Sequence, residues 1–120
     1  MIGKLELEKK LSYLLGQELA TKIIDTSLVV EVEKNTEIVK EGQYIKYIPI
    51  VLSGLVKVST RKEDKELLLY YIQPFESCVM SFSACLKNEV SKIFASTEDN
   101  STIILIPTEN VLKWIFVYRL

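Results

Sequence analysis

Histidine is absent from this chain of 120 residues. Its absence removes the side chain that most often ligates metals and most often acts as a general base near neutral pH. It also excludes every nucleophile that depends on a histidine partner for activation. We therefore expect neither catalytic residues nor a metal site, and we do not expect an enzyme.

Cysteine is scarce, since Cys78 and Cys85 are the only two in the chain. Two thiols cannot form a four-thiolate zinc or iron–sulfur site, and they are too few for a disulfide framework. Long apolar runs are also missing, because no stretch approaches the roughly 18 apolar residues that a membrane span requires. The first ten residues are rich in charge, unlike the apolar core of a signal peptide. We expect a cytoplasmic protein with reduced thiols and no membrane partner.

The chain has no excess of either charge, because 15 basic and 16 acidic residues give a net charge of −1. The basic residues are scattered, whereas nucleic-acid binding normally needs a concentrated positive face. Hydrophobic residues make up 48% and charged residues 26% of the chain, which is ordinary for a globular domain. The length suits one domain with one core, and we expect no DNA-binding surface in it.

Apolar residues at helical spacing open the chain. They are Leu7, Leu11, Leu14, Leu15 and Leu19, with charged residues on the opposite face. This pattern predicts an amphipathic helix over residues 5–24. Gly16 lies inside it and marks a point where the helix can break in two.

From residue 27 the hydrophobic period changes to two, which is typical of half-buried strands. Strands are predicted at 30–32, 36–40, 44–52, 55–61, 67–72, 91–96 and 102–106, with turn residues between them. Pro49 has no N–H to donate, so it predicts an edge strand or a bulge. The all-charged stretch 61–66 predicts a solvated hairpin tip. A helix, seven to eight short antiparallel strands and a helix together predict a mainly β jelly roll or small barrel over 27–106.

A final helix is predicted over 107–120, where Pro107 and Thr108 suit its first turn. The helix is apolar on more than one face, so it needs two partners to pack on. One is its own sheet, and the other is expected to be a second chain or a downstream domain, because the chain ends in mid-pattern. The candidate interface residues of such a homodimer are Trp114, Ile115, Val117 and Tyr118.

Three motifs carry a resemblance to a known family. They are E-G-Q at 41–43, V-L-S-G-L-V-K-V at 51–58 and E-L-L-L-Y-Y-I-Q-P at 66–74. In this order they resemble the cyclic-nucleotide-binding domain of the Crp/Fnr family of bacterial transcription regulators, over roughly residues 20–120. The resemblance implies a double-stranded β-helix effector domain flanked by helices, with the last helix at a dimer interface. It also implies that DNA is contacted only through a helix-turn-helix domain that this chain does not contain.

The family's phosphate-binding cassette has a Pro-Gly-Asp turn, a Gly-Glu pair that opens a short helix, and an Arg-Ser or Arg-Thr pair about ten residues later. The resemblance places residues 74–76 at the turn, Val79 and Met80 at the Gly-Glu pair, and Ser91 and Lys92 near the arginine. Met80 cannot accept a hydrogen bond from a ribose, and Ser91 carries no charge. Lys92 offers a point charge but no guanidinium fork. We therefore expect a degenerate cassette that does not bind cyclic AMP in the usual way.

Three interpretations of FESCVMSFSACL, residues 75–86, remain open. In the first, apolar side chains fill the roll interior and the serines cap a short helix. In the second, the segment is a remodelled pocket for a small anionic or nucleotide-like effector, favoured by a helix N-terminus. The candidate ligand-binding residues are Glu76, Ser77, Cys78, Val79, Met80, Ser81, Ser83, Ser91 and Lys92.

The third interpretation is redox sensing by Cys78 and Cys85. If the segment is helical, two turns separate these residues by ~10 Å, which exceeds the distance that a disulfide tolerates. A reactive thiolate would also need nearby positive charge, for which Lys87 and Lys92 are the candidates.

The sequence therefore predicts a ligand-sensing effector domain of a Crp/Fnr-type regulator. In this interpretation the segment 75–95 moves against the helix 107–120 and re-aims a DNA-binding domain. The alternatives are a ligand-free module for dimerisation or protein interaction, and a thiol-based redox sensor.

Overall fold

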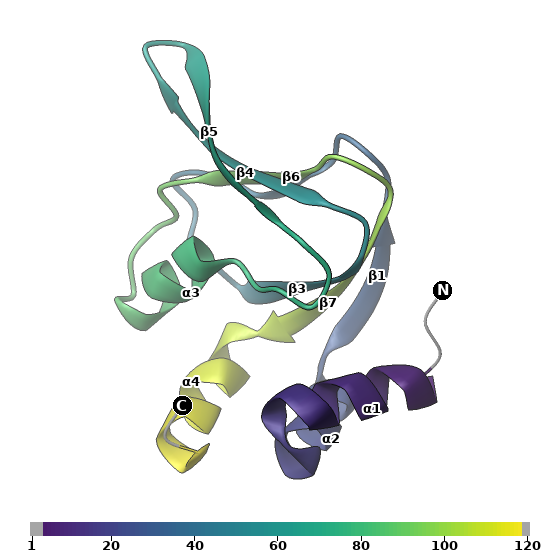
Figure 1. Cartoon of the computed structure of the whole chain (residues 1–120). Coiled ribbons are helices and arrows are strands. Elements are labelled where there is room, and N and C mark those ends of the chain that lie inside the picture. Colours follow the sequence, from purple (N-terminus) through teal and green to yellow (C-terminus); the bar gives the residue numbers. More distant parts are fainter. Residues whose placement is uncertain (1–3, 119–120) are drawn as a thin grey trace.

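The structure, a computed structural model, describes the backbone of residues 4–118. Within that span it describes all side chains except those of residues 4, 5, 14, 79, 82 and 115–118. Two antiparallel sheets face each other, and helices cover the outer face of one of them (Figure 1). This is the predicted mainly β jelly roll with flanking helices.

Seven strands build the two sheets in the described part of the chain. The first sheet contains β1 (Leu28–Val32), β7 (Ser101–Pro107) and β3 (Tyr47–Ser53), in that order. The second contains β2 (Glu37–Val39), β6 (Phe94–Thr97), β4 (Val56–Lys62) and β5 (Lys65–Ile72), in that order. All neighbouring strands are antiparallel. As Pro49 predicts, β3 lies at a sheet edge.

Four helices accompany the sheets. They are α1 (Lys4–Leu15), α2 (Gln17–Thr26), α3 (Val79–Leu86) and α4 (Thr108–Tyr118). Gly16, with φ of 87°, separates α1 from α2, and a positive φ is readily adopted only by glycine. The helix expected over 5–24 is thus interrupted where the sequence places a possible break.

Strands β7 and β3 of the first sheet are buried on both faces and divide the interior into two cores. Ile104 and Ile106 of β7 point to a helix core that also contains Leu11 of α1 and Trp114 of α4. Ile103 points the opposite way, into the space between the two sheets, where Val51, Val56 and Val58 pack. Because side chains alternate along a strand, β7 contributes to both cores.

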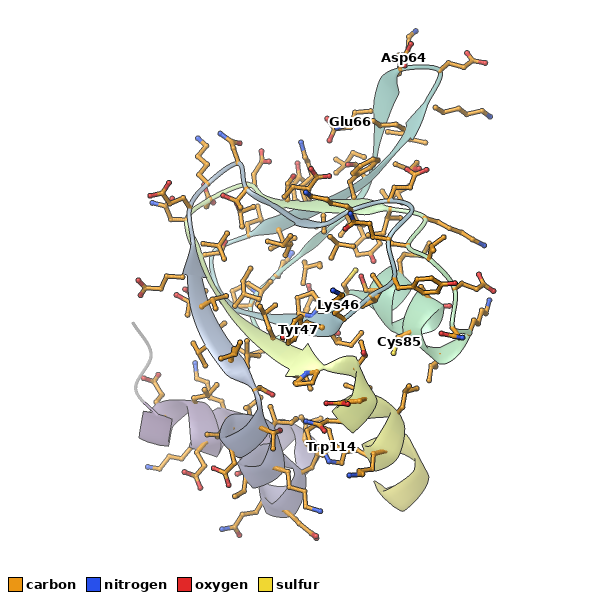
Figure 2. The ribbon with its side chains drawn as sticks, turned by 180° about the vertical axis from the view of Figure 1, so that it is seen from behind. Lys46, Tyr47, Asp64, Glu66, Cys85 and Trp114 are labelled. Carbon is orange, nitrogen blue, oxygen red and sulfur yellow. The ribbon has the colours of Figure 1, made fainter. Side chains whose placement is uncertain are left out.

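The β4–β5 hairpin projects from the body of the molecule, with Asp64 at its tip (Figures 1 and 2). Glu63 and Asp64 both have positive φ, 54° and 64°, as a two-residue hairpin turn of type I′ requires. The Lys57 ammonium lies 2.9 Å from the Glu66 carboxylate across the hairpin. The predicted charged tip over 61–66 is therefore an exposed hairpin end.

Gly54 joins β3 to β4 where the backbone of the next turn approaches closely. Its φ is 94°, and a Cβ atom built there would lie 2.7 Å from the carbonyl oxygen of Asn100 and would also collide with Ser101. Both the conformation and the space require glycine. This position is the glycine of the V-L-S-G-L-V-K-V motif.

Candidate functional site

The turn before α3 spans Gln73–Glu76, at the position of the family's Pro-Gly-Asp turn. Phe75 has φ of 66°, where that turn has glycine. The Glu76 carboxylate accepts a hydrogen bond from the Gln73 N–H at 2.8 Å. The Phe75 N–H donates to the Val51 carbonyl at 2.6 Å, which fastens the turn to β3. Glu76, a candidate ligand-binding residue, thus holds its own turn.

The N-terminus of α3 has no serine cap, so the prediction that serines cap this helix is wrong. The N-cap residue is Cys78, and its side chain makes no capping hydrogen bond. The Ser81 hydroxyl instead donates to Cys78 Sγ at 3.0 Å, and both residues are fully buried. Ser77 forms an isolated bridge with Ile50 of β3, and Ser83 is half-buried on α3.

Tyr70 of β5 reaches the first turn of α3, and the sequence did not single it out. Its hydroxyl oxygen accepts a hydrogen bond from the Met80 N–H at 3.3 Å and lies 3.7 Å from Cys78 Sγ. The Met80 side chain itself is 38% exposed. Backbone N–H groups at a helix N-terminus are the groups that bind anions, and here one of them already has a partner. The sequence signal that could have indicated Tyr70 is the period-2 alternation on β5, which turns its side chain to the same side as Ile72.

The electrostatic surroundings of Tyr70 favour its neutral form. Burial, followed by the neighbouring Cys78, raises the pKa of Tyr70 to about 12. Taking a phenol out of water penalises the charged phenolate. The Tyr70 hydroxyl therefore stays a neutral phenol at neutral pH, and none of the side chains of Tyr70, Cys78 and Ser81 offers a cation to a phosphate.

Ser91 and Lys92 have other partners than the start of α3. Ser91 is buried, and its hydroxyl donates to the Ile93 carbonyl at 2.9 Å, while its backbone pairs with Gly42 and Gln43. The Lys92 ammonium lies 3.4 Å from the Glu89 carboxylate. Of the candidate residues, the structure brings together Cys78, Met80 and Ser81. The side chain of Val79 lies outside the described residues.

The two cysteines are free and belong to different cores. Cys78 is fully buried in the core between the sheets. Cys85, which Figure 2 labels on α3, packs against the helix core. Burial raises the pKa of the Cys85 thiol, which disfavours the reactive thiolate. Lys92, one of the two lysines expected to stabilise such a thiolate, is paired with Glu89. The geometry thus gives no support to the redox interpretation.

Trp114, a candidate dimer residue, lies in the helix core of its own chain and is 7% exposed. Figure 2 shows it between α4 and the N-terminal helices. It therefore offers little surface to a second chain. Leu112, on the same helix, is 43% exposed. The side chains of Ile115, Val117 and Tyr118 lie outside the described residues.

A separate cavity of about 640 Å³ lies between β1, β7, β3 and the segment 38–47. Most of its lining residues are apolar, and its polar side chains are those of Lys40, Gln43, Tyr44, Lys46 and Tyr47. The sequence predicts strands over 36–40 and 44–52 with a turn between them, and this prediction includes no cavity. The signal it passed over is the alternation of Tyr44 and Lys46 with apolar Ile45.

Two classes of site are not found among the described residues. No group of three or more His, Cys, Asp or Glu side chains there could hold a metal ion. None of the helices there combines the length and the apolar character that a membrane crossing demands.

No protein-family model and no curated protein matches the chain. Solved structures do match it. A protein from Ruegeria pomeroyi assigned as a cyclic nucleotide binding protein has a TM-score of 0.80 and 14% identity, over 94% of this chain and 52% of that one. The sensor domain of the transcriptional regulator DNR from Pseudomonas aeruginosa has a TM-score of 0.73 and 14% identity, over 86% of this chain and 69% of that domain.

The cAMP-bound form of the EAL enzyme Bd1971 is also similar, with a TM-score of 0.68 and 18% identity, over 73% of this chain. The chain spans 23% of that enzyme and about half of the Ruegeria protein. The structural neighbours are thus cyclic-nucleotide-binding domains, and they include a sensor domain of a transcription regulator. At such low identity they establish the fold.

Proposed function

We propose that this chain is the ligand-sensing effector domain of a Crp/Fnr-type bacterial transcription regulator, and that it does not bind cyclic AMP through the usual cassette. The observation that carries the proposal is the hydrogen bond from the Met80 N–H to the Tyr70 hydroxyl, in a fold shared with the DNR sensor domain. A side chain of the domain occupies the helix N-terminus that a cyclic phosphate needs.

The lack of an arginine at the cassette position also supports the proposal that cyclic AMP is not bound in the usual way. A cyclic phosphate is bound tightly when an arginine offers a bidentate pair of donors, and Ser91 stands near that position. The nearest lysine in the sequence, Lys92, pairs with Glu89 at 3.4 Å. A cyclic nucleotide entering here would have to displace the Tyr70 hydroxyl, and the two residues near the arginine position, Ser91 and Lys92, would offer it no unpaired cation in return.

Strand β3 lies between residues 75–95, which include α3, and helix α4. The turn Gln73–Glu76 is fastened to Val51 of β3, and the Thr108 N–H at the start of α4 donates to the Lys46 carbonyl just before β3. Strand β3 thus contacts both the α3 segment and the base of α4. We expect a shift of residues 75–95 to change the orientation of α4, as a switch between two packings.

The proposal includes a homodimer through α4 in the cytoplasm, with Leu112 on its exposed side. Its test is a reporter fusion in which this chain replaces the dimerisation domain of a repressor whose DNA-binding domain acts only as a dimer. Repression that changes when an effector is added supports a sensory domain. Failure to repress, with the fusion protein present and folded, contradicts it.

Calorimetric titration with cyclic AMP and cyclic GMP tests the second part of the proposal. We expect no saturable heat with either nucleotide at concentrations up to the millimolar range. Micromolar binding of cyclic AMP that is lost in the Met80→Trp variant, which keeps the Tyr70 contact through its backbone N–H and adds uncharged bulk at the helix start, would show a working cassette.

A ligand-free dimerisation or protein-interaction module is the second candidate. The occupied helix N-terminus favours it, because Tyr70, Cys78 and Ser81 already satisfy one another. The reporter fusion separates the two, since this module gives constant repression that no small molecule alters.

A further inference from the structure

The cavity lined by β1, β7, β3 and the segment 38–47 differs from the cassette in its lining residues and in its chemistry. Its inner surface is formed by Val30 of β1, Ile103 and Leu105 of β7, and Pro49 of β3. Ile103 and Pro49 are fully buried and form its floor. Lys46 and Tyr47, both labelled in Figure 2, lie just before and at the start of β3 and are exposed. A volume of about 640 Å³ falls within the range of roughly 300–1,000 Å³ that is typical of small-molecule sites.

Polar and apolar groups are segregated within this cavity. The described polar side chains that line it, those of Lys40, Gln43, Tyr44, Lys46 and Tyr47, all belong to exposed residues. A ligand must therefore place its polar group at the mouth and an apolar body inside. A nucleobase with its ribose does not suit such an interior, because buried polar groups need hydrogen-bond partners.

The charge at the mouth is positive. Lys40 and Lys46 are both exposed there, and no acidic side chain lines the described part of the cavity. The ion pairs found among the described residues involve other lysines, namely Lys10, Lys22, Lys57 and Lys92. Two unpaired ammonium groups above an apolar interior favour an anionic head group, and the phenols of Tyr44 and Tyr47 add two donors.

We infer that this cavity binds an apolar monocarboxylic acid, with its hydrocarbon body against Val30, Ile103 and Leu105 and its carboxylate between Lys40 and Lys46. Burial of apolar surface supplies the affinity, and the lysines select the charged end. This inference does not depend on the proposed regulatory role, because an acid-binding module of any function would have the same site.

The experiment measures binding of dansyl-undecanoate to the full chain by fluorescence, below the critical micelle concentration, followed by displacement with decanoate or decan-1-ol. We expect saturable binding and displacement by both compounds. The Lys40→Gln/Lys46→Gln variant should weaken decanoate at least tenfold and decan-1-ol less than twofold. The Lys62→Gln/Lys65→Gln variant is the matched control, with the same loss of charge at the exposed hairpin, and should bind like the wild type.

A second variant tests the location of the site. Val30→Trp places an indole in the cavity and should abolish binding of all three compounds, while circular dichroism and thermal melting show whether the fold persists. Tyr70→Phe alters the cassette position and should leave binding unchanged. Absence of saturable binding overturns the inference. So does binding that a folded Val30→Trp variant retains, because the probe would then lie on exposed apolar surface elsewhere.

Discussion

The hydroxyl oxygen of Tyr70 accepts a hydrogen bond from the Met80 N–H at 3.3 Å, which joins β5 to the first turn of α3. The same oxygen lies 3.7 Å from Cys78 Sγ, and that sulfur accepts from Ser81 at 3.0 Å. The Tyr70 side chain thus connects strand β5 with helix α3, which follows it in the chain. These contacts hold the first turn of α3 against β5 without a ligand.

Tyr70→Phe removes this hydroxyl and keeps the ring. We expect the free energy of unfolding to fall by about 1 kcal/mol, the usual contribution of one intramolecular hydrogen bond. Urea unfolding followed by circular dichroism measures the change. Tyr71→Phe, on the same strand and 40% exposed, is the matched control and should change stability by less than ~0.5 kcal/mol. Equal unfolding midpoints for the two variants would contradict a stabilising role for the Tyr70 hydroxyl.

Alkaline pH should destabilise the chain through the same residue. Its pKa is raised from 10.0 to about 12 in the folded protein, so the unfolded chain loses this proton first as pH rises. The contribution is fully present below pH 10 and is lost between pH 10 and about 12. Urea midpoints from pH 8.5 to 11 should fall more steeply for the wild type than for Tyr70→Phe. Parallel curves would show that Tyr70 does not titrate differently in the folded state.

Gly54→Ala should be far more damaging than Gly42→Ala, although both glycines have positive φ of 94° and 86°. A Cβ at Gly54 meets backbone 2.7 Å away, whereas one at Gly42 has nothing within 4 Å. We expect about 1 kcal/mol for the strained backbone alone at Gly42, and about 3 kcal/mol at Gly54, where overpacking is added. Chemical denaturation of both variants gives the comparison. Similar losses would mean that the turn at Asn100 yields without cost.

Two residues of α4 should separate folding from association. Trp114→Ala opens a space in the helix core and should cost about 3–5 kcal/mol of stability. Leu112→Lys changes an exposed residue and should leave monomer stability nearly unaltered. If α4 forms the dimer interface, Leu112→Lys should lower the association constant in sedimentation equilibrium by at least tenfold. A dimer of wild-type strength would place the interface elsewhere.

The sequence was informative wherever a local pattern determines structure. The period-2 stretches, the charged hairpin tip and Pro49 at a sheet edge all have their counterparts in the fold. It could not reveal the role of Tyr70, because alternation says which way a side chain points but not which backbone group it meets. The positive φ of Phe75, 66°, could not be predicted either, because a bulky side chain normally favours a negative φ. The prediction of serine caps was wrong because the Ser81 hydroxyl donates to the buried Cys78 sulfur instead.

The arrangement of β7 between two cores has a consequence for strand register. Residues 103–106 read Ile-Ile-Leu-Ile, so a slip by one residue would exchange one apolar set for another of nearly the same size. Hydrophobic patterning usually specifies the register of a strand, but here it hardly distinguishes one register from the next. The information lies at the two ends of the strand: Ser101, whose hydroxyl accepts from the Leu55 N–H beside Gly54, and Pro107, after which α4 begins. In this chain the polar and conformational residues at the strand ends, more than the isoleucines between them, specify which side chain enters which core.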